Sequence, residues 1–153
     1  MKLSGGVEWS LHCCVVLSQA QGPVPTARLA ELHGVSKTYL AKHLRALAQA
    51  GLVNPTEGRD GGYVLTRPPE NITVHDVVQA VDGKEPAFRC TEIRQQGILA
   101  APPEQCLAPC GIAKVMADAE KVWRASLSGV TIADLAATLD LPALKKVLAA
   151  PSN

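Results

Sequence analysis

The stretch Pro25–Arg67, PTARLAELHGVSKTYLAKHLRALAQAGLVNPTEGRDGGYVLTR, decides the fold of this chain. Thr26 is placed to cap a first short helix and Ser36 a second, longer one, with the pair His33–Gly34 in the turn between them. Two helices joined by a short glycine turn are typical of a helix-turn-helix, whose second helix enters the major groove of DNA. Apolar residues recur at helical spacing in both segments, at Leu29, Leu32, Val35, Tyr39, Leu40, Leu44, Leu47 and Ala48.

The end of the same stretch predicts a β-hairpin. Gly51 is placed to end the second helix, and the segments LVNPTEG and GYVLTR then flank the glycine-rich turn EGRDGG. A helix-turn-helix followed by a hairpin is a winged helix. We therefore expect a mainly α protein with a small β wing.

The side chains of this region suit DNA. Groups that bond to phosphates and base edges gather on the second helix, and Arg59 stands at the tip of the wing. The alternative is a small α+β domain with solvated basic residues. We favour DNA binding because the helix caps, the glycine turn, the apolar spacing and the predicted wing all indicate it. The candidate DNA contacts are Thr26, Ser36, Lys37, Thr38, Tyr39, Lys42, His43, Arg45 and Arg59.

Composition gives weaker indications. The chain has 153 residues and a net charge of +1, but residues 1–67 hold seven Lys or Arg against four Asp or Glu, whereas residues 68–153 hold eight against ten. No apolar run is long enough to span a membrane, and the N-terminus lacks a signal-peptide pattern, so we expect a cytoplasmic protein. In that compartment the five cysteines are not expected to form structural disulfides.

Helices are predicted on both sides of the winged helix. The segment 7–21 carries Glu8 and His12 four positions apart on one face, and Cys13 and Cys14 in an apolar run that suggests small core residues. Thr73 with Asp76 is expected to cap a helix over 74–81. The segment 111–128 repeats apolar residues at spacings of three and four, and we expect it to be the main contact of a homodimer, although a monomer has the alternative of burying this stripe on its own winged helix. Thr131 with Asp134 and then Pro142 start two short helices.

These elements suggest three regions. Residues 1–82 form the DNA-binding domain, 83–110 a loop, and 111–153 the dimerisation helix with the C-terminal helices. The loop has little periodicity and carries Cys90, Cys106 and Cys110. Thiolates are ligands for iron–sulfur clusters or zinc, and the spacing here is not the paired C-x-x-C form of a zinc ribbon.

The segment YLAKHLRALAQAGLV, followed by EGRDGGYVLTRPPENITVHDVVQAVDG, resembles the IscR/NsrR-type family of bacterial winged-helix regulators. The resemblance covers roughly residues 7–135 and is closest to redox-sensing members that hold a 2Fe–2S cluster. It implies a homodimeric DNA-binding transcription regulator, expected to be a repressor, with an iron–sulfur cluster.

The resemblance also implies a set of ligands. The family has three closely spaced cysteines before its long helix, whereas here the middle spacing is stretched, so that Cys90 and Cys110 match best and Cys106 less well. Some relatives have a ligating His where this chain has Ala113, and nitric-oxide-sensing members borrow an acidic residue from the partner's first helix. Glu8 stands at that place, with His12 one turn further on. We therefore expect a 2Fe–2S cluster across the dimer interface.

In that expected site, Cys90 and Cys110 come from one subunit and Glu8 and His12 from the other. Three alternatives stay open: Cys106 replaces one ligand, Cys106 is a spare redox thiol, or Glu8 and His12 are only a surface pair. Imidazole in place of thiolate raises the reduction potential of a cluster, which suits sensing by electron gain and loss. Trp9 is either a relay from these ligands to the helix-turn-helix or a core aromatic residue.

Other functions fit less well. A regulator without a cluster, whose cysteines sense oxidants as thiols, is the main alternative. An electron carrier would not need a wing and a recognition helix. No nucleophile constellation is present, and GRDGG lacks the Lys and Ser/Thr context of a phosphate-binding loop, so we do not expect an enzyme.

Overall fold

The computed structural model of the chain describes residues 2–151. They form two compact units, which are described separately. The winged-helix unit comprises Lys2–Lys84 together with the described residues from Leu127 onward, and the α5 unit comprises Glu85–Ser126.

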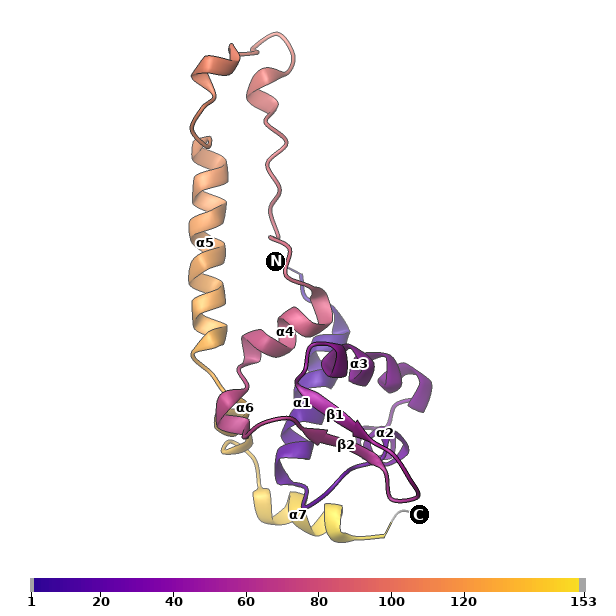
Figure 1. Cartoon of the computed structure of the whole chain (residues 1–153). Coiled ribbons are helices and arrows are strands. Elements are labelled where there is room, and N and C mark those ends of the chain that lie inside the picture. The colour runs from indigo at the N-terminus through magenta and orange to yellow at the C-terminus, as the bar shows by residue number, and fades with distance from the viewer. Residues whose placement is uncertain (1, 152–153) are drawn as a thin grey trace. The chain divides into compact units, whose positions relative to one another are not determined.

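The winged-helix unit confirms the predicted fold class, which is mainly helical with a two-stranded antiparallel wing (Figure 1). The two strands pair with Val53 opposite Leu65 and Thr56 opposite Gly62, and Tyr63 also bridges back to Val24. The elements are α1 (Gly5–Gln19), α2 (Thr26–His33), α3 (Lys37–Gln49), β1 (Val53–Thr56), β2 (Gly62–Leu65), the 3-10 helix η1 (Pro69–Asn71) and α4 (Val74–Asp82).

The helix ends follow the local sequence with one exception. The Ser36 hydroxyl accepts a hydrogen bond from the backbone N–H of Tyr39 at 3.1 Å, which confirms the predicted cap of α3. Gly34 has φ +66° in the turn between α2 and α3, a backbone conformation that glycine adopts without strain. The predicted cap of α2 is wrong: Pro25 holds that position and Thr26 is the first helical residue, with no side-chain capping bond.

Helix α1 lies at the centre of the unit and contacts α3, α4, α6, α7 and β2. Cys13 and Cys14 are fully buried, as predicted for small core residues, and burial raises the pKa of each thiol to about 12. Fully buried Leu29, Leu40, Leu44 and Leu47 fix α2 and α3 against this core. The core therefore holds the helix-turn-helix directly onto α1.

Two short C-terminal helices, α6 (Ile132–Ala136) and α7 (Leu141–Ala149), belong to the same unit. Both α4 and α6 begin with the predicted capping boxes, Thr73 with Asp76 and Thr131 with Asp134. The two capping threonines also form a β-bridge, and both α6 and α7 pack on α1. We expected these two helices to form one region with the long helix. In the structure they pack against the winged helix.

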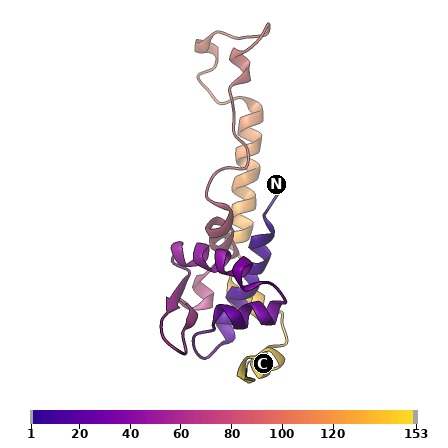
Figure 2. The same ribbon diagram turned by 90° about the vertical axis from the view of Figure 1, so that its right-hand side faces the viewer.

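The predicted long helix is a single unbroken element, α5 (Gly111–Ser128), and its residues 111–126 belong to the α5 unit. Residues 90–110 gather at its N-terminal end, where η2 (Ile93–Gln95) and η3 (Pro103–Gln105) are the only helical turns described in that segment (Figures 1 and 2). The backbone N–H of Ala87 donates to Glu120 of α5 at 3.1 Å, so the incoming chain is tied to the helix. Among the residues described, no helix is both long and apolar enough to cross a membrane.

Candidate DNA interface and cysteine site

The candidate DNA contacts are displayed by α2, α3 and the wing. Lys37, Thr38, Lys42 and Arg45 are exposed on α3, and Arg59 is exposed in the turn between β1 and β2. None of these cations takes part in the ion pairs found among residues 2–151. Ser36 is exposed at the start of α3, Tyr39 retains 42% exposure, and Thr26 is half-buried at the start of α2. Unpaired, exposed cations on a helix and a wing tip are suited to phosphate contact.

His43 is an exception and requires a correction. It is only 8% exposed and packs under the start of α1, so its ring does not face outward with Lys42 and Arg45. Burial lowers the pKa of His43, the nearby Lys42 charge lowers it further, and Asp82 acts in the opposite direction. The sequence carried a signal for this position, because Leu40, His43, Leu44 and Leu47 follow the spacing of one buried helix face. His43 therefore belongs to the core side of the recognition helix.

The structure brings Cys90 and Cys110 together. The two residues are twenty positions apart in the sequence, yet the Cys90 side chain is close enough to Cys110 to lower the pKa of its thiol. The Cys110 sulfur accepts the backbone N–H of Ala113 at 3.3 Å in the first turn of α5, and the Cys90 sulfur accepts the N–H of Glu92 at 3.4 Å. The Ala113 N–H is the largest cause that lowers the pKa of the Cys110 thiol, as at other helix N-termini. Each sulfur thus accepts one backbone N–H, and at Cys110 this bond favours the thiolate.

A pair of charged residues, for which no role was predicted from the sequence, stabilises the same loop. Arg94 forms a two-pronged ion pair with Glu92, at 2.5 and 2.7 Å, and also donates to the carbonyl of Ala108. Glu92 has φ +54°, which is unfavourable for a residue with a Cβ, and the ion pair helps to hold it there. The hydrogen bonds to Glu92 raise the pKa of Arg94 most, and the charges of Glu92, Cys106 and Cys110 raise it further. Arg94 therefore places a permanent positive charge beside the cysteines.

Glu8 and His12 lie in the other unit, both exposed on one face of α1 as predicted. They line a hollow of about 250 Å³ between α1 and α6, whose other lining residues are largely apolar: Leu11, Val15, Leu135, Thr138 and Leu139. Within residues 2–151, no group of three or more His, Cys, Asp or Glu side chains is close enough to hold a metal ion. The described chain thus offers two separate pairs of potential ligands, one in each unit.

Trp9 lies between the core and this ligand face. It is half-buried against the core, and its ring meets His33 at the end of α2 edge-to-face, with centroids 6.1 Å apart. His33 also meets the ring of His12 at 5.9 Å and bonds through Nδ1 to the carbonyl of Leu29. His33, predicted from the sequence only as a turn residue, thus connects both Trp9 and His12 to the first helix of the helix-turn-helix.

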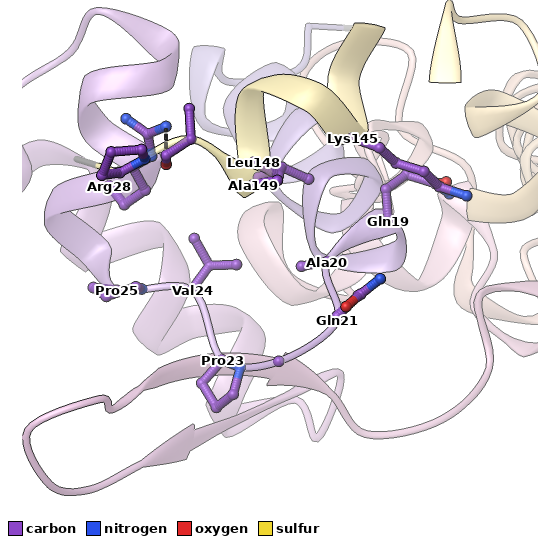
Figure 3. Close-up of a pocket in the computed structure, with 13 residues that line it drawn as sticks. Gln19, Ala20, Gln21, Pro23, Val24, Pro25, Arg28, Lys145, Leu148 and Ala149 are labelled. Carbon is purple, nitrogen blue, oxygen red and sulfur yellow. Dashed lines mark hydrogen bonds between the residues drawn. The ribbon is translucent and has the colours of Figure 1, made fainter. Parts of the chain in front are cut away.

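A larger pocket of about 580 Å³ lies between the α1–α2 connection and α7 (Figure 3). Arg28, a charged residue that lines this pocket, already has bonding partners. One of its nitrogens pairs with Glu31 at 2.7 Å, and the other donates hydrogen bonds to the carbonyls of Val147 and Ala150. Arg28 thus ties the end of α7 to α2 and has a structural role.

The different burial of the cysteines predicts their order of alkylation. In iron-free, reduced protein at pH 8, iodoacetamide is expected to modify Cys90, Cys106 and Cys110 at least about 100-fold faster than Cys13 and Cys14, because only a thiolate reacts and the buried pair stays protonated and covered. Mass-spectrometric peptide mapping over time measures the order. Rapid modification of the Cys13–Cys14 peptide in folded protein would contradict the buried position of this pair.

Known proteins are similar to this chain in sequence. Residues 3–138 match the Rrf2 family, described as iron-dependent transcriptional regulators. The HTH-type transcriptional regulator YwgB of Bacillus subtilis (strain 168) is 33% identical over 125 residues, which cover 80% of this chain and 76% of that protein. The HTH-type transcriptional regulator IscR of Escherichia coli is 40% identical over 76 residues, which are about half of each chain.

Solved structures show the same fold. CymR, the global cysteine regulator of B. subtilis, superimposes with a TM-score of 0.67 at 25% identity, over 92% of this chain and 99% of that one. IscR of T. potens superimposes with a TM-score of 0.65 at 24% identity, over 99% of this chain and 94% of that one. The chain therefore belongs to the Rrf2 family of DNA-binding transcriptional regulators, and not to a family of enzymes.

Proposed function

We propose that the protein is a homodimeric redox sensor, expected to act as a repressor, that binds double-stranded operator DNA under the control of a 2Fe–2S cluster held across the subunit interface. The observation that carries the proposal is the proximity of Cys90 and Cys110, each with a backbone N–H donated to its sulfur. Iron–sulfur clusters are bound by thiolates, and hydrogen bonds to sulfur tune their potentials.

The donor set fits such a cluster. The cysteine pair supplies two ligands, and two more are required. Glu8 and His12 are the second pair that the described chain presents, on an exposed face with a largely apolar surround. The separation of the two pairs into different units is compatible with ligands from two subunits. When bound, the cluster would supply one-electron chemistry, which changes the charge at the site by one unit.

The chain's own residues would then transmit the change of charge. His12 touches His33, and Trp9 touches His33, at the end of the helix-turn-helix's first helix. A movement of His12, or a change of its charge, would displace the rings of His33 and Trp9. Trp9 thus remains proposed as a relay residue, acting through packing.

A mixed-dimer experiment tests the shared site. One subunit carries Cys110→Ser and the other carries Glu8→Ala with His12→Ala, and differently tagged copies are co-expressed and purified as the heterodimer. If each site takes cysteines from one subunit and Glu8 with His12 from the other, one of the two sites keeps all its ligands. The heterodimer is then expected to hold half the wild-type iron and sulfide, whereas each mutant homodimer holds almost none.

Two results would contradict this arrangement. A heterodimer without iron would place all four ligands within one subunit, since both sites would then be damaged. Wild-type protein that is colourless after anaerobic purification, or that loads only zinc, would reject the cluster itself. Iron and sulfide assays with absorption spectra give both answers.

A second function has one observation in its favour. The proximity of the Cys90 and Cys110 thiols also suits a disulfide switch, in which a peroxide accepts two electrons and both thiol protons, leaves as water, and the S–S bond forms. In that case iron-free protein would respond to peroxide, and mass spectrometry under non-reducing conditions would find Cys90 joined to Cys110.

A further inference from the structure

The first residues of α1 are attached to two other elements of the winged-helix unit. Ser4 donates its backbone N–H to Asp82 at the end of α4 at 2.9 Å, and its hydroxyl donates to the same carboxylate. Two positions later, Gly6 is buried against His43 of the recognition helix α3. The start of α1 is thus held between α4 and α3 by short contacts.

Gly6 is required at its position by the closeness of His43. A Cβ on Gly6 would lie 2.6 Å from Nδ1 of His43, closer still to its Cε1, and 3.1 Å from Cγ1 of Val81. Real Cβ atoms do not approach that closely, so either the imidazole or the helix that carries it would have to move. Gly5 is different, because a Cβ there would meet only the Tyr39 hydroxyl at an ordinary 3.8 Å.

The other side of the His43 ring leads to the DNA-facing surface. Its ring contacts that of Tyr39 edge-to-face, with centroids 4.8 Å apart and planes at 75°. Tyr39 is 42% exposed in the first turn of α3, where its N–H bonds to Ser36. The Nε2 atom of His43 is buried and has no hydrogen-bond partner among the described residues, so packing alone defines the ring position.

We infer that the contact between Gly6 and His43 is the positioning contact that sets the recognition helix relative to the start of α1, and that it passes displacements of α1 to Tyr39 and the DNA-facing turn. The redox part of this inference rests on the proposed function, because Glu8, a proposed cluster ligand, lies two positions from Gly6 on the exposed side of the same helix. The static part rests only on the contact itself.

Gly6→Ala and Gly5→Ala are a matched pair of variants. Both make the same chemical change in the first turn of α1, and neither glycine has a positive φ, so backbone preference affects them equally. Operator DNA is titrated with each variant and with wild type, in gel shift or fluorescence anisotropy, using oxidised and dithionite-reduced protein. Gly6→Ala is expected to change operator affinity at least about ten-fold, while Gly5→Ala stays within about two-fold of wild type.

The variant His43→Ala completes a double-mutant cycle with Gly6→Ala. If the added methyl acts through His43, then Gly6→Ala made in the His43→Ala background should change affinity by less than about two-fold. A Gly6→Ala penalty that is the same in both backgrounds, or a Gly6→Ala protein that binds like Gly5→Ala, would overturn the inference. Hydrogen exchange of the α3 amides, compared between the two glycine variants, reports the same displacement without DNA.

A third comparison covers the case in which Gly6→Ala does not fold. His43→Ala leaves space beside Gly6, whereas His43→Gln refills most of it, and circular dichroism confirms the folding of each. We expect His43→Ala to reduce the ratio between oxidised and reduced operator affinities by at least about ten-fold, and His43→Gln to preserve most of it. Equal ratios in His43→Ala and wild type would overturn the redox part. A wild-type ratio of one would instead overturn the proposed function. The comparison of Gly6→Ala with Gly5→Ala would still test the contact between Gly6 and His43.

Discussion

Replacing Cys110 by serine is expected to abolish cluster binding and, with it, any redox dependence of operator binding. Cys110 is the better fixed of the two paired thiols, since its sulfur caps the first turn of α5 through the N–H of Ala113. Serine keeps that capping bond, because its hydroxyl accepts an N–H at a helix N-terminus. The fold of the loop should therefore survive while the soft ligand is lost.

The measurement is the visible absorption with iron and sulfide content of anaerobically purified protein, followed by operator titration in both redox states. Cys90→Ser should behave in the same way. Cys106→Ser is the matched control, because it removes a thiol of the same loop that lies outside the Cys90–Cys110 pair, and it should retain the cluster. Loss of iron in Cys106→Ser together with retention in Cys110→Ser would reverse the assignment of ligands.

Introducing glutamate at Val122 is expected to separate the proposed dimer and to lower operator affinity on the order of 100-fold or more, since each free subunit would hold one half-site alone. Helix α5 has no buried residue, and its apolar stripe is exposed, with Ile112 at 64%, Val115 at 65% and Val122 at 70%. Covering each such side chain stabilises an interface by roughly 1.5–3 kcal/mol, whereas an unpaired carboxylate buried there costs several kcal/mol.

Ala117→Glu is the control for this variant. It adds the same charge to the same helix, at an exposed position away from the apolar stripe, and it should leave the protein dimeric. Sedimentation equilibrium gives the mass of each variant and gel shift gives the affinity. If Val122→Glu remained a dimer with unchanged operator binding, the two subunits would have to meet through another surface.

The burial of His43 shows that residue type alone gave the wrong prediction for this position. The basic and polar residues of α3 were assigned together to DNA, yet the face that carries Leu40, Leu44 and Leu47 also carries His43. Residue type indicated a DNA contact, whereas position on the helix indicated the core, and position was correct. A histidine tolerates this burial because its neutral form carries no charge and its pKa is lowered there.

The sequence by itself determined the local elements of this protein: two helices around the Gly34 turn, the Ser36 cap of the second, the wing, the capping boxes at Thr73 and Thr131, and the burial of Cys13 and Cys14. Capping, turn conformation and hydrophobic period depend on residues only a few positions apart, so they can be read directly from the chain.

Only the tertiary structure decided the long-range contacts. It brought Cys90 near Cys110 across twenty positions, placed His33 against both Trp9 and His12, and packed Gly6 against His43. Such contacts depend on how separate elements pack, and an irregular loop such as 85–110 has no period that fixes which of its residues meet. The contacts that connect the proposed ligands to the helix-turn-helix are therefore defined by packing, whereas the DNA-reading framework is defined by local sequence.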